Sequence, residues 1–127
     1  MSYLADTHAL IWGLCAPERL STKARQLMES AAEPVYFSVA SVWEISIKLS
    51  LGKLKLDATV REFVQAQVRN GFQLLPIEVQ HVARVAELPF QHRDPFDRLL
   101  IAQALESDLE IITADPAFDR YPVGTIW

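Results

Sequence analysis

The chain has 127 residues, half of them hydrophobic, and a formal net charge of -4. This length and composition exclude a disordered, low-complexity or repeat protein and predict a single domain over residues 1–127. No apolar run is long enough to span a membrane, and the lone Cys15 excludes an internal disulfide and a cysteine-based zinc site, so we expect a cytoplasmic protein with no membrane partner.

The first apolar run, residues 2–5, predicts a buried strand. Asp6 or Thr7 directly after it provides a cap for a helix through residues 8–12. Ser21 caps a second predicted helix. The apolar positions of that helix recur at helical spacing, at Ala24, Leu27, Met28 and Ala31.

Residues 34–38 predict a second strand, which leads into a third helix over residues 38–51. An apolar stripe follows this helix, at Val39, Trp43, Ile47 and Leu51. Gly52 is typical of the residue that ends a helix. A fourth helix is predicted over residues 59–70. Its inward positions are expected to be Val60, Phe63, Val64 and Val68.

The C-terminal part repeats the alternation of strands and helices. Asp94 and Pro95 form a helix start signal, and residues 99–105 are apolar on most sides, which predicts a buried helix. The other predicted elements are strands over residues 72–76, 109–113 and 123–127, a helix over 78–87 and a short helix after 115. Short apolar strands between amphipathic helices predict an α/β fold, a three-layer sandwich with a central, mostly parallel sheet.

Four acids are expected near one edge of this sheet. Asp6 and Asp115 each follow a strand, Asp97 lies in the first turn of the buried helix, and Glu44 follows the second strand by at most two turns. Ligands of open parallel sheets bind outside the carboxyl ends of the strands. Converging carboxylates repel one another unless a cation lies between them, and oxygen-rich sites suit Mg²⁺ or Mn²⁺. Such a cation activates water and stabilises the charge that builds on a phosphate during hydrolysis.

Each acid also has an ordinary structural explanation. Asp6 and Asp115 are both in helix-capping contexts, and Asp97 in a first turn interacts favourably with the helix dipole. Glu44 is one turn from Lys48, which permits a surface ion pair. A non-catalytic binding module whose acids are helix caps therefore stays open, as does another metal-dependent phosphohydrolase or nuclease.

Longer motifs distinguish among these alternatives. They lie, in chain order, at residues 4–12, 38–45, 48, 52–54, 92–104 and 112–118. In these segments the chain resembles PIN-domain ribonucleases, in particular the VapC-type toxins of bacterial type II toxin–antitoxin pairs. The resemblance implies that the catalytic acids, which bind Mg²⁺ or Mn²⁺, are Asp6, Glu44, Asp97 and Asp115. It also implies that the Thr113 hydroxyl flanks the site and that Asp94 caps a helix rather than binding metal.

The resemblance implies a function as well. It predicts an endoribonuclease that cleaves single-stranded regions of RNA, such as tRNA or ribosomal RNA. Hydrolysis by water leaves 3′-hydroxyl and 5′-phosphate ends. It further predicts a homodimer that a cognate antitoxin inhibits, with an amphipathic helix as the natural ligand for a groove on the toxin.

The negative net charge is unusual for an RNA-binding protein, so binding must depend on the local field. Candidates for a basic rim are Lys48, Lys53, Lys55, Arg61, Arg93 and Arg98. The large aromatic residues expected in the core, rather than as platforms for bases, are Trp12, Trp43, Phe90 and Phe96. An exposed apolar patch for dimerisation is expected around Ile47, Leu51, Ile126 and Trp127.

Overall fold

A computed structural model describes residues 1–30 and 32–127, so Ala31, predicted at an apolar position of the second helix, lies outside the described residues. Within them, five short strands form one sheet in the order β3-β2-β1-β4-β5, and all neighbouring pairs are parallel. The strands are β1 (Tyr3–Ala5), β2 (Val35–Ser38), β3 (Gln73–Leu75), β4 (Glu110–Ile112) and β5 (Thr125–Ile126). The predicted parallel sheet is confirmed.

The helices alternate with these strands as the sequence predicts. They are α1 (Thr7–Cys15), α2 (Thr22–Glu29), α3 (Val39–Ser50), α4 (Val60–Arg69), α5 (Val79–Glu87) and α6 (Pro95–Ser107), with short 3-10 turns at Pro17–Arg19 and Pro116–Arg120. Asp6, and not Thr7, is the residue that caps α1. Ser21 and Asp94 cap α2 and α6 as predicted, each accepting hydrogen bonds from the backbone of the first turn.

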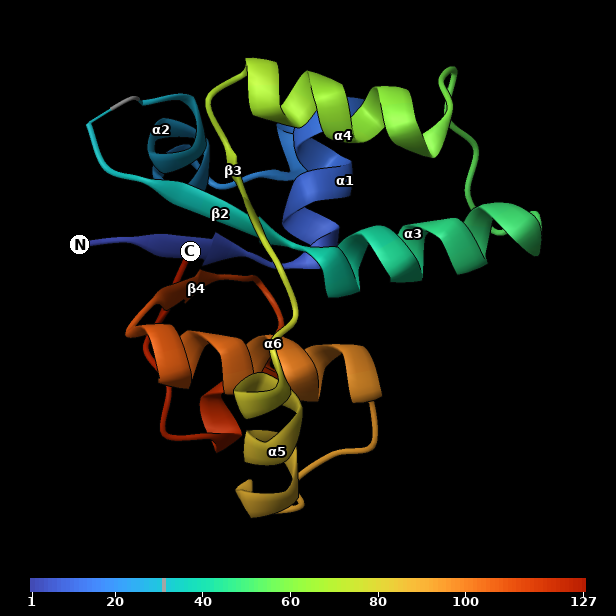
Figure 1. Ribbon diagram of the computed structural model, residues 1–127. Coiled ribbons are helices and arrows are strands. Elements are labelled where there is room, and N and C mark those ends of the chain that lie inside the picture. Colours follow the sequence, from blue (N-terminus) through green and yellow to red (C-terminus); the bar gives the residue numbers. More distant parts are fainter. Residues whose placement is uncertain (31) are drawn as a thin grey trace.

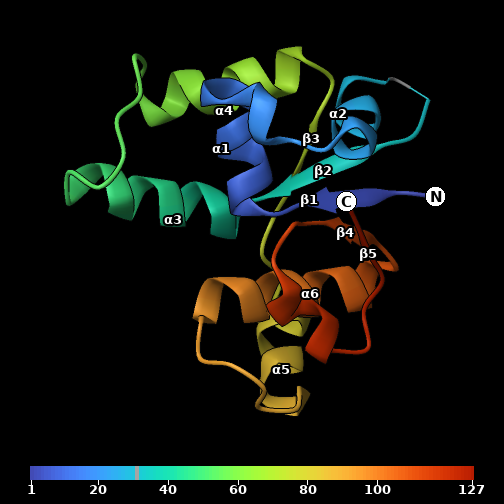
Figure 2. The same cartoon turned by 180° about the vertical axis from the view of Figure 1, so that it is seen from behind.

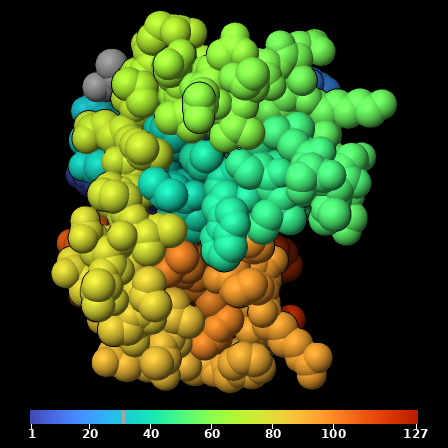
Figure 3. Space-filling view, turned by 45° about the vertical axis from the view of Figure 1, so that its right-hand side comes forward, coloured from blue at the N-terminus to red at the C-terminus, as the bar shows by residue number. Residues whose placement is uncertain are grey.

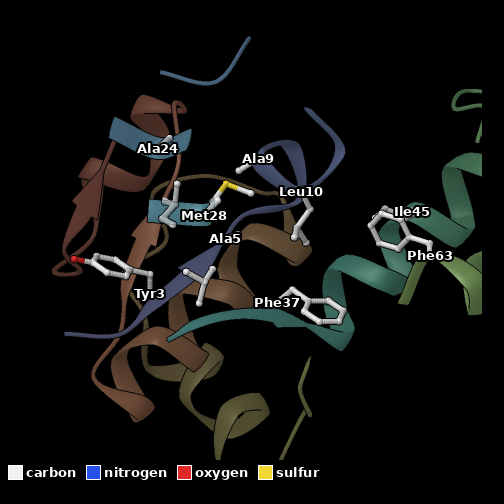
Figure 4. Packing of buried hydrophobic residues seen from close by; sticks show 11 residues of the cluster. Tyr3, Ala5, Ala9, Leu10, Ala24, Met28, Phe37, Ile45 and Phe63 are labelled. Atoms are coloured by element: carbon white, nitrogen blue, oxygen red, sulfur yellow. The ribbon is translucent and has the colours of Figure 1, made fainter. Parts of the chain in front are cut away.

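Helices cover both faces of the sheet, which confirms the three-layer arrangement (Figures 1 and 2). In Figure 1, α1, α2 and α4 lie above the sheet, and α5 and α6 lie below it. The upper core includes Phe37 of β2, Ile45 of α3 and Phe63 of α4, which Figure 4 shows together. The lower core includes Leu100 and Ile101 of α6, whose side chains are fully buried.

The sheet register sets the position of the acids. Ala5 of β1 pairs with Phe37 of β2 on one side and with Ile112 of β4 on the other. The residues that follow these strands therefore meet at one edge, where α1 and α3 begin and away from the N-terminus (Figure 1). This edge is the usual place for ligands in an open parallel sheet.

The prediction for the faces of α3 is wrong. Trp43 and Leu51, two members of the apolar stripe, are 58% and 61% exposed. The buried face carries Ala40, Ser41, Glu44 and Ile45 instead. Small and polar residues lie inward because α3 contacts both α1 and α6 at the edge of the sheet. Figure 3 shows α3 between α4 and α6.

A smaller correction applies to α4. Phe63 is buried as predicted, but Val68 is 52% exposed and its neighbour Gln67 is buried. One residue along a helix turns the side chain by about 100°, so adjacent positions lie on different faces. None of the helices in residues 1–30 and 32–127 is long and apolar enough to cross a membrane.

Candidate active site

Asp6 is held by two hydrogen bonds at the end of β1. Its Oδ1 accepts from the backbone N–H of Ala9, 2.8 Å away, and its Oδ2 accepts from the Thr113 hydroxyl, 2.6 Å away. Burial raises the pKa of Asp6 and these two bonds oppose that rise, while the charge of Asp115 adds to it. The cap that was one explanation for Asp6 is thus real, but it occupies only one of the two oxygens.

Thr113 connects two of the predicted acids. Its hydroxyl donates to Asp6 and accepts from the backbone N–H of Asp115, 3.0 Å away. The Asp115 carboxylate in turn accepts from the N–H of Ala117, 2.9 Å away, and caps the 3-10 turn after β4. Thr113 therefore lies between Asp6 and Asp115, beside the acids as the family resemblance implies.

Asp94 and Asp97 begin α6. The Asp94 Oδ1 accepts from the backbone N–H groups of Phe96 and Asp97, at 2.9 and 3.0 Å, so Asp94 has the capping position expected of it. The Asp97 side chain is only 18% exposed. A carboxylate in this position has lost most of its hydration, which is costly without a counter-charge.

Asp97 is surrounded by other acids. Burial, together with the negative charges of Asp94, Glu44, Asp115 and Asp6, raises its pKa to about 8. The structure therefore brings the other three acids implied by the resemblance within electrostatic range of Asp97. Their mutual repulsion is the conflict that a bound cation relieves.

Glu44 lies on the buried face of α3. Its Oε2 is 3.2 Å from the ammonium of Lys48, which is the ion pair considered as an alternative explanation. Its Oε1 is buried and has no hydrogen-bond partner among the described residues. A buried acceptor without a donor costs about 1–3 kcal/mol, so the ion pair alone does not account for Glu44.

This set of groups fits a hard divalent cation in its chemistry. The donors are carboxylate oxygens. The Glu44 Oε1 lacks a hydrogen-bond partner among the described residues, and the Asp97 carboxylate is surrounded by other negative charges. No three His, Cys, Asp or Glu side chains in the described residues stand close enough to form a ready-made cage. Mg²⁺ does not require one, because it is usually held by one or two carboxylates and completed by water and substrate phosphates.

Solvent reaches the acids through an open cavity of about 270 Å³. It is lined by Asp6, His8, Trp12, Ala114, Asp115 and Pro116. The cavity therefore opens onto two of the four acids at the carboxyl edge of the sheet, which gives a phosphate-containing ligand a way in.

Two features of this region were missed from the sequence. The His92 Nε2 lies 3.4 Å from the Asp97 Oδ2, although His92 precedes the cap of α6 and the only signal was its nearness in sequence. The Thr7 hydroxyl lies 2.9 Å from that of Ser41, and both are buried. This pair links α1 to α3 beside Asp6 and one turn before Glu44.

The predicted rim and core need correction. Arg98 is buried and donates to the carbonyl oxygens of Pro89 and Val85, so it stabilises the fold rather than lining a rim. Trp43 and Phe90, expected in the core, are 58% and 73% exposed. The exposed Phe90 ring makes a cation–π contact with the Arg98 guanidinium, whose central carbon is 4.9 Å from the ring centre.

Comparison with known proteins places the chain in a family. The PIN domain profile matches residues 3–124. Ribonuclease VapC22 of Mycobacterium tuberculosis is 29% identical over 128 residues, covering 98% of this chain and 97% of the relative. Similar solved structures include VapBC2 from Rickettsia felis bound to a promoter DNA fragment, with a TM-score of 0.77, 13% identity and coverage of 100% of this chain and 99% of that chain. A toxin–antitoxin complex from Klebsiella pneumoniae has a TM-score of 0.68, 18% identity and coverage of 98% and 96%. The chain belongs to the PIN domain family.

Proposed function

We propose that this chain is the toxin of a type II toxin–antitoxin pair and acts as a divalent-metal-dependent endoribonuclease. The observation that carries the proposal is the group of acids at the carboxyl edge of the sheet, Asp6, Glu44, Asp97 and Asp115. Membership of the PIN domain family and similarity to a protein named a ribonuclease support it. Residues 1–127 form a single nuclease domain in this proposal.

Helix capping is not a sufficient alternative. Asp6, Asp94 and Asp115 do make capping hydrogen bonds. Asp97 and Glu44 make none, and both are largely buried. A module whose acids were only caps has no use for these two carboxylates, and we therefore favour the enzyme.

The four acids would hold Mg²⁺ or Mn²⁺. When bound, the cation supplies activation of water and stabilisation of the negative charge on the scissile phosphate. Thr113 keeps Asp6 and Asp115 in a fixed relation, since its one hydroxyl contacts both residues. The ammonium of Lys48, next to Glu44, offers a positive charge to an incoming phosphate.

The substrate in this proposal is a single-stranded region of RNA, such as a loop of tRNA or ribosomal RNA, in the cytoplasm. Unpaired strands fit an open site that combines positive charge with exposed aromatic rings. Basic residues whose side chains are exposed near or beyond α3 and before α6 are Lys53, Lys55, Arg61 and Arg93. The products carry 3′-hydroxyl and 5′-phosphate ends.

A cognate antitoxin is the proposed inhibitor. An apolar cavity of about 300 Å³ lies between α1, α2 and α4. Its apolar lining includes Leu10, Leu14, Pro17, Leu20, Met28 and Phe72. Leu14 is 49% exposed there, and an amphipathic helix of the antitoxin is the natural occupant of such a groove.

A homodimer is proposed through the outer face of α3. Trp43 and Leu51 expose large apolar surfaces that a monomer leaves in water. Ile126 and Trp127, also expected in such a patch, are only partly exposed. Sedimentation across a range of protein concentrations tests this proposal, and a monomeric mass at every micromolar concentration contradicts it.

RNA cleavage tests the enzymatic proposal directly. We would incubate a set of structured and single-stranded RNAs with the chain and Mn²⁺ or Mg²⁺, with an EDTA control. The variants are Asp6→Asn and Asp97→Asn, and the matched control is Asp57→Asn, which changes an exposed acid in the loop after α3. We expect cleavage that needs the cation, leaves 3′-hydroxyl ends, persists in the control and disappears in both site variants. Cleavage that survives in EDTA or in both site variants contradicts the proposal.

A further inference from the structure

The contacts of Tyr121 determine which nitrogen of His92 carries the ring proton. From them we infer that His92 is a positioning residue for Asp97, with its proton held on Nε2 by Tyr121 and Arg98. This inference rests on the proposed function in assigning Asp97 to the metal site. The assignment of the proton stands on hydrogen bonds alone.

The Tyr121 oxygen receives two N–H groups that can donate but cannot accept a hydrogen bond. The Nη1 of Arg98 donates to it from 3.0 Å, and the backbone N–H of His92 donates from 3.2 Å. A phenolic oxygen accepts at most two such bonds and has one hydrogen to donate. That hydrogen must therefore go to a third partner.

The third partner is the ring of His92. Its Nδ1 lies 2.7 Å from the Tyr121 oxygen. Since Tyr121 donates this bond, Nδ1 accepts it and carries no proton. The ring proton then sits on Nε2, because the hydrogen bond at one ring nitrogen determines which nitrogen carries the proton.

Arg98 makes this arrangement rigid. Its guanidinium is buried, donates to the carbonyl oxygens of Pro89 and Val85 at 3.0 and 3.2 Å, and lies over the ring of Phe90. Arginine has only donors, so it cannot exchange roles with Tyr121. The donor and acceptor roles in the contacts from Arg98 through Tyr121 to His92 are therefore fixed.

The last contact in this series joins His92 to Asp97. The His92 Nε2–H points to the Asp97 Oδ2 across 3.4 Å, a distance at the long end for a hydrogen bond. In the described part of the chain, His92 is the only side chain that hydrogen-bonds to this carboxylate, and its other charged neighbours are acids. His92 thus restrains the orientation of the Asp97 carboxylate, which would help to hold the cation.

Two substitutions of His92 separate this role from a structural one. In His92→Gln the amide nitrogen takes roughly the place of Nε2 and can still donate to Asp97. In His92→Asn the shorter amide reaches roughly the place of Nδ1 and keeps only the contact with Tyr121. We expect His92→Asn to lower kcat at least about 10-fold with little change in KM, and His92→Gln to stay within a few-fold of the wild type. Equal losses in both variants, or none in either, overturn the inference.

Nuclear magnetic resonance of the imidazole nitrogens gives a readout that does not depend on activity. In the metal-free wild-type chain we expect a protonated Nε2 and an unprotonated Nδ1 for His92. Tyr121→Phe removes the donor to Nδ1 and should convert the signals to a mixture of tautomers, whereas Tyr36→Phe should leave them unchanged. A proton on Nδ1 in the wild type, or an unchanged spectrum in Tyr121→Phe, overturns the inference. A wild type with the expected tautomer and no RNA cleavage would instead contradict the proposed function.

Discussion

Helices α3 and α6 both deliver an acid to the same edge of the sheet, but they are built in opposite ways. In α6 the acid lies in the first turn, and the following turns bury Leu100 and Ile101 completely. In α3 the acid lies on the inward face itself, next to Ser41 and Ile45, while Trp43 faces outward. In α6 the acid and the fully buried apolar residues thus lie in different turns. In α3 the acid lies on the buried face and a large apolar side chain lies on the exposed face.

This difference separates a helix whose hydrophobic pattern predicts its burial from one whose pattern does not. The sequence of α6 satisfies its core and its site in separate turns, so its hydrophobic pattern predicts its burial. The sequence of α3 places a carboxylate on its inward face and leaves large apolar side chains on the outward face. In the proposed function, the outward apolar side chains of α3 face a second copy of the chain and its inward carboxylate faces the cation.

The largest expected effect comes from removing the charge on the inward face of α3. Glu44→Gln keeps the shape of the side chain and removes its charge, so we expect the rate of RNA cleavage to fall by about 100-fold or more. The matched control is Glu87→Gln, which changes a glutamate whose side chain is 73% exposed at the end of α5. Measurement of single-turnover cleavage at saturating Mn²⁺ decides this, and equal rates for the two variants would contradict the role of Glu44.

The next effect compares two leucines on the two helices. Leu100 of α6 is fully buried and Leu51 at the end of α3 is 61% exposed. We expect Leu100→Ala to lower the free energy of unfolding by about 2–5 kcal/mol, and Leu51→Ala by less than about 0.5 kcal/mol in the monomer. Urea unfolding at low protein concentration measures both, and similar losses would mean that Leu51 is not on an outer face.

A third effect concerns the acid that α6 contributes. Folded Asp97 has a pKa of about 8, well above its ordinary value of 3.8. Between these values the folded chain binds more protons than the unfolded chain, so the free energy of unfolding falls as the pH rises, and the penalty is complete above about pH 8. Asp97→Asn in EDTA should therefore stabilise the fold by about 1–3 kcal/mol near pH 9, after allowance for solvent screening, and by almost nothing near pH 4. A variant less stable than the wild type near pH 9 would show that the acids do not repel one another.

The smallest effect concerns the ion pair on α3. The side chains of Lys48 and Glu44 are 30% and 12% exposed. Ion pairs that water still reaches contribute little, so Lys48→Met should lower the free energy of unfolding by less than about 1 kcal/mol. A decrease of several kcal/mol in the free energy of unfolding, measured in urea, would mean that Glu44 serves the ion pair rather than a bound cation.

Local signals made much of this structure predictable. The strands formed by short apolar runs, and the caps at Asp6, Ser21 and Asp94, depend on neighbouring residues, so each is predictable from its own segment. The placement of the acids near one edge of the sheet was predictable for the same reason, because each acid follows a recognisable strand or helix start.

Contacts between distant segments were not predictable. The Tyr121 hydroxyl contacts His92 and Arg98, which are 29 and 23 residues away in the sequence. No pattern in either segment predicts that the two segments are in contact. The burial of Arg98 follows from that contact, so a residue that looked like part of a basic rim belongs to the interior. Hydrophobic spacing likewise could not say which face of α3 points inward, since a side chain on the wrong face is still at helical spacing.

Binding of Mn²⁺ to the metal-free chain is the most direct test of the central claim that the acids at the carboxyl edge form a divalent-metal site. We would titrate Mn²⁺ by calorimetry into the wild-type chain, into the double variant Asp6→Asn with Asp97→Asn, and into the control Asp57→Asn. The account predicts saturable binding in the wild type and the control, and at least about 10-fold weaker binding in the double variant. Identical isotherms for the wild type and the double variant, or no binding to the wild type, would contradict it.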